Sequence, residues 1–288
     1  MWNVIFTVLT VLLLICIWVM IYDGNRFVVR EHTFTDARIR KNCRAVVLAD
    51  LHNKRYGRDN SQLLAAIREL KPDMILVAGD MLNAKPGATL EIALHLLGEL
   101  ANDYPIYYGN GNHEHRMALY PDTYKDMAER YAEGLGQLGI EPMVNVHVKL
   151  ADYGIAIYGL QIDREYYKRF KTYPMDKSYL HSLLGQVDKS FYSVLLAHNP
   201  DYFPEYAAWG ADLTLAGHVH GGLVRIPIVG KGLASPKISF FPKYDGGRFE
   251  EEDRVMLVSR GLGVHTIPIR VFNPGELLLI NFQNESLS

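Results

Sequence analysis

Apolar runs that each end in a polar cluster with metal-binding side chains constrain this chain more than any other feature. Five such clusters follow one another in the sequence: Asp50-Leu51-His52, Gly79-Asp80, Gly111-Asn112-His113-Glu114, His198 and Gly217-His218-Val219-His220. They combine carboxylate, amide oxygen and imidazole, a set of ligands that suits a pair of divalent cations. Paired cations are in turn suited to the hydrolysis of phosphate esters.

The first half of the chain alternates between predicted strands and predicted helices. Continuous apolar runs predict buried strands at 44–49, 74–78 and 106–108, and apolar residues recur at helical spacing within 63–70, 90–97 and 127–138. This alternation implies parallel strands, and ligands collect at the carboxyl ends of such strands. The first three polar clusters stand at three such ends, so we expect them to meet at one edge of a sheet.

The second half is richer in strands, which we expect at 144–150, 153–160, 191–197, 213–216, 254–259 and 277–282. The acidic run 250–253 is expected as an exposed hairpin tip. The predicted fold class is α/β, a four-layer α/β/β/α sandwich of two packed mixed sheets, preceded by one N-terminal transmembrane helix. We divide the chain into an anchor at 1–24, a linker with a first extended segment at 25–43 and a catalytic domain at 44–288.

The N-terminal segment 2–22 carries no charged side chain and is long enough to cross a lipid bilayer as a helix. Trp2, Trp18 and Tyr22 lie near its ends, where such rings favour the membrane interface. A cleaved signal peptide would need basic residues before the apolar stretch and small residues at a cleavage site, and neither is present. A buried core helix is the least favoured alternative. We expect a single-pass anchor in the cell membrane, with the basic residues after it holding the catalytic domain in the cytoplasm.

Charge and cysteine content exclude other classes of protein. The formal net charge of -2 provides no positive field for nucleic-acid binding, which we do not expect. Cys16 lies inside the apolar leader and Cys43 well beyond it, so no disulfide is expected. The sequence has no Cys-x-x-Cys motif for a thiolate metal site. Any metal site in this chain is therefore expected to use histidine and oxygen ligands.

The five clusters, in this order, resemble the calcineurin-like metallophosphoesterase superfamily over roughly residues 44–282. The stretches 221–227 and 259–263 are similar to a bacterial branch with N-terminal membrane segments. The resemblance implies that Asp50, His52 and His220 hold one metal ion, that Asn112, His198 and His218 hold a second, and that Asp80 and a hydroxide bridge the two. Such ligands accept Mn, Fe, Zn or Co. Ala49 and Val219 replace a common serine and threonine, but neither departure removes a ligand.

The resemblance also implies a role for His113, which contacts the scissile phosphate rather than a metal, while Glu114 is expected to orient His113 or a ligand imidazole. The predicted activity is cleavage of phosphodiester, phosphomonoester or pyrophosphate bonds by the bridging hydroxide, on a lipid-linked or nucleotide substrate. The alternative is a non-catalytic, membrane-tethered interaction module on the same fold. Such modules lose metal ligands, whereas all seven positions here carry competent side chains.

Two further sequence features bear on function. A hydrolase with a Ser or Cys nucleophile would need a nucleophile-elbow sequence, which the chain lacks. The aromatic and basic stretch 166–171 could form a lid or a membrane-facing patch. We expect it to be an exposed surface turn.

Overall fold

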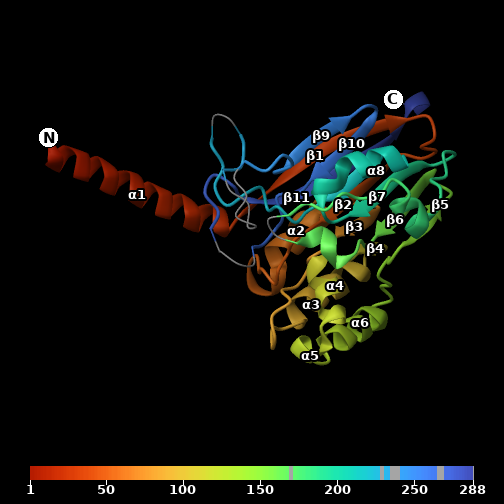
Figure 1. Cartoon of the computed structure of the whole chain (residues 1–288), viewed down its shortest axis with the longest axis horizontal. Helices are drawn as coiled ribbons and strands as arrows, with labels where there is room; N and C mark the ends of the chain where they lie inside the picture. The colour runs from red at the N-terminus through yellow and green to blue at the C-terminus, as the bar shows by residue number, and fades with distance from the viewer. Residues whose placement is uncertain (169–170, 228–229, 234–240, 265–268, 288) are drawn as a thin grey trace.

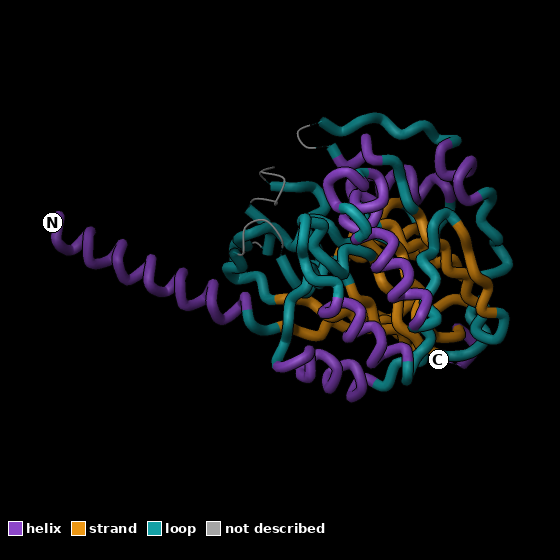
Figure 2. Tube along the Cα trace, turned by 90° about the horizontal axis from the view of Figure 1, so that it is seen from below, coloured by secondary structure: helices purple, strands orange, loops and turns teal. Residues whose placement is uncertain are grey.

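The computed structural model of the protein describes residues 1–168, 171–227, 230–233, 241–264 and 269–287. In these ranges two β-sheets pack face to face, helices cover their outer faces, and a long N-terminal helix projects from one end of the body (Figure 1). Seen from below, the strands lie inside the body with helices around them (Figure 2). The prediction of an α/β sandwich with two mixed sheets is confirmed.

The first sheet has five strands in the order β1-β11-β2-β3-β4. Their bounds are β1 (Phe27–Asp36), β11 (Gly275–Asn284), β2 (Cys43–Leu48), β3 (Met74–Ala78) and β4 (Ile106–Gly109). Strands β2, β3 and β4 are parallel, with Leu48 opposite Val77 and Val77 opposite Tyr108. Strand β11 runs antiparallel to β2. The carboxyl ends of the three parallel strands therefore lie at one edge.

The segment 25–43, expected as a linker with an extended stretch, contains the edge strand β1. This strand pairs with β11 in parallel over its full length, from Phe27 opposite Gly275 to Asp36 opposite Asn284. Because β11 is antiparallel to β2, both β1 and β11 begin at the edge where β2, β3 and β4 end. The N-terminal helix, which precedes β1, therefore meets the body at that same edge.

The second sheet has six strands in the order β5-β6-β7-β8-β10-β9. Their bounds are β5 (Val146–Leu150), β6 (Ile155–Leu160), β7 (Tyr192–Ala197), β8 (Leu213–Ala216), β10 (Arg254–Val258) and β9 (Gly247–Glu251). The four central strands are parallel, and the edge strands β5 and β9 are antiparallel to their neighbours. The acidic run 250–253 forms the tip of the β9–β10 hairpin, as predicted.

Helices cover the outer face of each sheet. Over the first sheet lie α2 (Ser61–Leu70), α3 (Glu91–Ala101), α4 (Asn112–Leu119), α5 (Pro121–Tyr124) and α6 (Met127–Gln137), and over the second lie α7 (Tyr179–Leu184) and α8 (Phe203–Trp209). Four short 3-10 turns complete the described elements: η1 (Arg58–Asn60), η2 (Arg164–Tyr167), η3 (Pro200–Tyr202) and η4 (Glu285–Leu287). Pro72, two residues after α2, cannot continue that helix, which ends at Leu70.

The continuous apolar runs of the central strands follow from this layering. In β2, Val46 and Leu48 face the helices, whereas Ala45 and Val47 face the second sheet. Successive side chains of a strand point to opposite faces. A strand covered on both faces must therefore be apolar throughout, which is why these strands lack the polar alternation of an exposed sheet.

Helix α1 (Trp2–Gly24) projects from the body and is exposed along most of its length (Figure 1). Its 23 residues span roughly 35 Å, enough for a hydrocarbon core of about 30 Å. The mean hydropathy of 3.0 makes it apolar enough to cross a membrane, a property that N-terminal signal sequences share. Val19 and Asp23, in its final turns, are the buried residues of this helix.

Candidate metal centre

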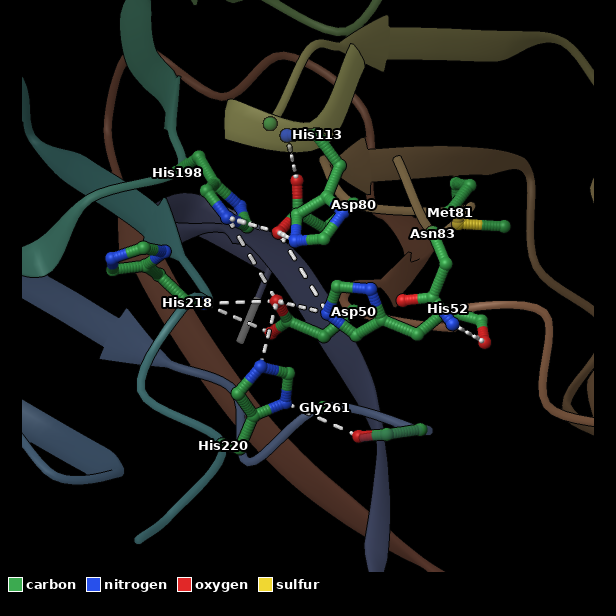
Figure 3. A network of polar contacts seen from close by, with 12 residues as sticks. Asp50, His52, Asp80, Met81, Asn83, His113, His198, His218, His220 and Gly261 are labelled. Atoms are coloured by element: carbon green, nitrogen blue, oxygen red, sulfur yellow. Dashed lines mark hydrogen bonds and ion pairs between the residues drawn. The ribbon is translucent and has the colours of Figure 1, made fainter. Parts of the chain in front are cut away.

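The polar clusters meet at the edge where the parallel strands of both sheets end. Asp50 follows β2, Asp80 follows β3 and His113 lies in the first turn of α4 after β4, while His198 and His218 follow β7 and β8. Figure 3 shows the imidazoles of His52, His198 and His220 directed toward the carboxylates of Asp50 and Asp80. The three clusters of the first sheet meet at one edge, as the sequence predicted, and the clusters after β7 and β8 of the second sheet join them there.

Most of these side chains leave the backbone at strained positions. The left-handed conformation occurs at Asp50, His52, Asp80, His218 and His220, with φ between 46° and 73°. Residues other than glycine adopt it rarely, and it costs of order 1 kcal/mol or more at each position. Such strain persists only where neighbouring contacts hold it, and it gathers at functional sites.

Backbone hydrogen bonds between the cluster loops hold this geometry. The N–H of Asp50 donates to the carbonyl of Gly79 at 2.9 Å, and the N–H of His52 donates to the carbonyl of Asp80 at 3.1 Å. The N–H of His218 donates to both carboxylate oxygens of Asp50 at 3.0 Å. The two sheets are thus tied together at the point where their polar side chains meet.

One group of candidate ligands consists of Asp50, His52 and His220, whose ligand atoms lie within 4.8 Å of one another. Nε2 of His52 is 3.7 Å from Oδ1 of Asp50, and Nε2 of His220 is 3.9 Å from the same oxygen. All three side chains are buried. This is the set that the family resemblance implies for the first metal.

A second group consists of Asp80, His198 and His218, again within 4.8 Å. Nε2 of His198 is 3.1 Å from Oδ2 of Asp80, and the same oxygen is 3.7 Å from Nε2 of His52 in the first group. The Asp80 carboxylate therefore lies between the two groups, where a bridging ligand would stand. The loop after β8 bends at its left-handed residues, so His218 and His220 enter different groups.

Asn112, the seventh predicted ligand, is the first residue of α4 and is 8% exposed. Its amide oxygen Oδ1 is buried and has no hydrogen-bond partner within the described ranges. A buried acceptor without a donor is unfavourable, and a cation would satisfy it. The next residue, His113, donates its backbone N–H to Oδ1 of Asp80 at 2.8 Å, which ties the start of α4 to the centre.

Backbone carbonyls fix the orientation of three ligand imidazoles. Nδ1 of His52 faces the carbonyl of Leu82 at 3.3 Å, Nδ1 of His198 faces that of Ala78 at 2.7 Å, and Nδ1 of His220 faces that of Gly263 at 3.2 Å. A carbonyl can only accept, so each Nδ1 carries a proton and each Nε2 faces the centre, where its lone pair is available to a metal ion once that nitrogen is deprotonated. Ligand histidines in proteins are oriented in this way. The residues present therefore fit a pair of metal ions.

His113 has the opposite tautomer. Its Nδ1 accepts the backbone N–H of Ala84 at 2.8 Å, so the neutral ring carries its proton on Nε2. Burial lowers the pKa of His113 to about 3, although Asp80 opposes the shift, so the ring is neutral near pH 7. Nε2 lies 3.9 Å from Oδ2 of Asp80. His113 also groups geometrically with His52 and Asp80, but a protonated Nε2 donates a hydrogen bond and does not bind a metal.

The two neighbours of His113 in the centre have shifted pKa values as well. Burial by itself would raise the pKa of Asp80, but the neighbouring imidazoles, His198 first among them, outweigh it and hold this pKa well below its usual value. Burial would lower the pKa of His198, but Asp80 and Asp50 outweigh it and raise this pKa to about 9. The buried centre thus keeps Asp80 anionic, as a metal ligand must be.

Glu114 differs from its expected role, because it holds backbone rather than an imidazole. Its carboxylate accepts the N–H groups of Asp80, Met81 and Gly111 at 2.8–3.0 Å and the hydroxyl of Tyr108 at 3.0 Å. Burial, with Asp80 adding to it, raises the pKa of Glu114 to about 7. Four donors nevertheless occupy both oxygens, which favours the carboxylate form. Glu114 thus fixes the loop that carries Asp80.

Tyr167 belongs to the centre, although the sequence placed it in an exposed turn. Tyr166 and Tyr167 are both buried in η2, and the Tyr167 ring stands edge-on to His218 with centroids 5.3 Å apart. The expectation of a surface turn is wrong for these two residues, because their rings pack into the core under the second sheet's helices. Positions 169–170 lie outside the described residues. The sequence around this aromatic pair contains no pattern that predicts the contact between Tyr167 and His218.

Comparison with known proteins identifies the family of this chain. Residues 43–222 match the sequence pattern of the calcineurin-like phosphoesterase family, which is more than half of the chain. The chain belongs to this family. The resemblance drawn from the five clusters is therefore confirmed.

Three relatives show the range of similarity. An uncharacterized metallophosphoesterase of Campylobacter jejuni is 26% identical over 86% of this chain, which spans 61% of that relative's length. The uncharacterized metallophosphoesterase YkuE of Bacillus subtilis is 23% identical over 83% of this chain and 78% of its own. The phosphodiesterase YaeI of Escherichia coli is 27% identical over 75% of this chain and 73% of its own. Among solved structures, a dimetal phosphatase from Danio rerio matches with a TM-score of 0.42 and 13% identity, covering 78% of this chain and 89% of that one.

Proposed function

We propose that this protein is a binuclear metal-dependent hydrolase of phosphoric esters. The observation that carries the proposal is the pair of buried ligand groups on either side of the Asp80 carboxylate. Asp50, His52 and His220 would hold one ion, Asn112, His198 and His218 would hold the other, and Asp80 would contact both. When bound, two divalent ions supply a water activated for attack and neutralise the charge on the phosphoryl oxygens.

The chain's own side chains have separate tasks in this proposal. The carbonyl-bonded imidazoles hold their Nε2 atoms toward the centre before any ligand arrives, so little reorganisation is needed. His198 would lose to an incoming metal ion the proton that its raised pKa keeps there. His113, neutral and protonated on Nε2, would donate that hydrogen to a phosphoryl oxygen or to the departing oxygen. Glu114 would keep Asp80 in place through the backbone.

Phosphodiesters are the first substrate class to test, because one relative is named a phosphodiesterase. Monoesters and pyrophosphates are the other classes. Helix α1 meets the body at the edge that carries the metal centre, which supports a substrate at a membrane surface, such as a lipid-linked phosphate or nucleotide.

We also propose a single-pass membrane protein with its catalytic domain in the cytoplasm, because the basic residues near α1 all follow it.

The test is an activity screen of the purified full-length protein in detergent. Metal-free protein is loaded in turn with Mn, Fe, Zn or Co and assayed on a phosphomonoester, a phosphodiester and a nucleotide-diphosphate lipid. We expect activity with at least one metal, two ions per chain, and loss of turnover in Asp80→Asn with the fold retained. Asp103→Asn is the matched control, because Asp103 is exposed and precedes β4 at the end of the first sheet that lies away from the candidate metal centre.

A full set of metals with undiminished turnover in Asp80→Asn would contradict the binuclear assignment. Protein that binds no metal and hydrolyses none of the substrates would favour the alternative, a non-catalytic interaction module. The two outcomes differ in metal content, so one experiment separates them.

A further inference from the structure

The end of helix α1 is built into the body through a buried carboxylate. Asp23, in the last turn, is only 2% exposed, although most of the helix is exposed. One oxygen accepts the backbone N–H of Asn273 at 3.0 Å, and the other accepts the guanidinium of Arg26 at 3.0 Å. A buried carboxylate without partners would be strongly unfavourable. Here the partner on the body side lies 250 residues away in the sequence.

Asn273 connects this carboxylate to the loop that carries a candidate metal ligand. Its side chain is fully buried, and Nδ2 donates to the carbonyl of His220 at 2.8 Å and to that of Gly222 at 2.5 Å. These two bonds span the bend of the loop. His220 has a φ of 55°, a left-handed conformation that needs external support. Asn273 provides that support directly.

Arg270 closes the network from the other side of His220. Its guanidinium donates to the carbonyl of Asn273 at 3.2 Å and to that of Gly263 at 2.7 Å. The same Gly263 carbonyl accepts Nδ1–H of His220 at 3.2 Å. The backbone and the ring of His220 are therefore both fixed by one buried network, whose outer end is Asp23.

We infer that Asp23 is a positioning residue for the metal ion held by Asp50, His52 and His220, and that the last turn of α1 is a permanent part of the folded protein. The inference rests on the proposed function only in taking His220 as a metal ligand. It goes beyond an anchor, because a helix that merely tethers the domain would contribute nothing to the centre. It also separates α1 from a signal sequence, since cleavage after the apolar stretch would remove a constituent of the site.

The test compares Asp23→Ala with Asp23→Asn in the full-length protein in detergent. Equilibrium dialysis with Mn²⁺ measures the affinity of each of the two ions. In Asp23→Ala we expect about tenfold weaker binding of one ion, as when partners of metal ligands are removed, and unchanged binding of the other. Asp23→Asn keeps an oxygen acceptor for the N–H of Asn273, so it should restore most of that affinity. Asp103→Ala, which breaks an ion pair with Arg68, is the control for general destabilisation.

Hydrogen exchange provides a second measurement without metal or activity. In metal-free Asp23→Ala, backbone amides of 218–223 should exchange faster than in the wild type, while those of 74–78 should not change. Unchanged affinity for both ions in folded Asp23→Ala, or equal loss for both, would overturn the inference. The intact mass of wild-type protein from membranes is an independent check, because a chain that begins after Asp23 would also overturn it. Wild-type protein with fewer than two ions would instead count against the proposed function.

Discussion

Two side chains next to the candidate metal ligands have roles that depend on which of their atoms accept hydrogen bonds and which donate them. Glu114 is acceptor-only and takes four donors, three of them backbone N–H groups. His113 takes one backbone donor on Nδ1 and therefore presents a hydrogen on Nε2. Although they are adjacent in the sequence, they have different contacts: Glu114 binds the backbone of the Asp80 loop, and Nε2 of His113 lies 3.9 Å from the Asp80 carboxylate.

Glu114→Gln should destabilise the Asp80 loop although it is nearly isosteric. The new amide nitrogen would face N–H donors, and hydrogen bonds to a charged group are worth about 1.5–3 kcal/mol each. We expect a loss of at least 2 kcal/mol in the free energy of unfolding and weaker binding of both ions. Urea unfolding and metal dialysis measure the two effects. A variant as stable as the wild type would show that the carboxylate charge is unimportant.

His113→Ala should lower the maximal rate by on the order of 10²-fold or more and leave the metal stoichiometry unchanged. The reason is that in the proposed function its Nε2–H would contact the substrate and not a metal. The loss should shrink for substrates whose leaving groups are very acidic, because those need no protonation. Steady-state kinetics with a series of leaving groups, together with metal analysis, tests both points. Loss of one ion per chain would instead make His113 a ligand.

At the scale of elements, the centre depends on how closely the loop after β8 approaches the loop after β2. The N–H of Gly217, the first residue after β8, also donates to the carbonyl of His198, the first residue after β7, at 3.1 Å. A Cβ at Gly217 would overlap the Asp50 carboxylate. Glycine is needed here for lack of space, and its φ is not left-handed. The left-handed positions after it fall on His218, His220, Gly221 and Gly222.

Gly217→Ala should therefore displace Asp50 and weaken binding of at least one ion by tenfold or more. The control is Gly136→Ala in α6, where a Cβ would meet nothing within 4 Å. That change should raise stability by about 0.5–1 kcal/mol, because alanine is the better helix former. Metal dialysis and thermal unfolding of both variants give the comparison. Normal metal binding in Gly217→Ala would mean that the loops separate at little cost.

At the scale of the whole molecule, the two sheets are joined at both edges. The metal centre joins them at one edge, and an ion cluster joins them at the other. Arg38, after β1, binds Asp36 at 2.7 Å and Asp212 at 3.0 Å, and Asp212 directly precedes β8 of the second sheet. Helix α1 enters at the metal edge. The overall arrangement therefore brings the apolar helix α1 and the candidate metal centre to the same end.

Asp36→Asn should destabilise the protein by about 1 kcal/mol at pH 7. The hydrogen bonds from Arg38 outweigh burial and hold the pKa of Asp36 below its ordinary value of 3.8. The stabilisation is therefore full above about pH 4 and disappears as the pH falls through the folded-state pKa. Urea unfolding of both proteins should show the gap closing toward pH 2. Asp253→Asn, at the exposed hairpin tip, is the control, and a gap independent of pH would contradict the ion pair.

The anchor should matter for membrane substrates and hardly at all for soluble ones. A variant that lacks residues 2–18 keeps the buried Val19 and Asp23 but cannot span a bilayer. We expect hydrolysis of a soluble phosphodiester within about twofold of the full-length protein, and cleavage of a phosphoester in vesicles slower by on the order of 10²-fold, because tethering supplies effective concentration. The measurement is the rate of hydrolysis of each substrate by equal amounts of the full-length protein and the shortened variant. Equal loss on both substrates, or on neither, would remove the link between anchor and substrate.

The sequence by itself determined the fold class and the set of candidate ligands. Apolar runs long enough for buried strands specify the layers, and polar clusters directly after those runs must lie at strand ends whatever the loops do. Tertiary structure alone decided which donors Glu114 binds, that Tyr167 packs against His218, and that Asp23 reaches His220 through Asn273. These contacts join residues far apart in the chain. Single buried hydrogen bonds between distant loops leave no periodic trace in the sequence, whereas burial of a whole strand does.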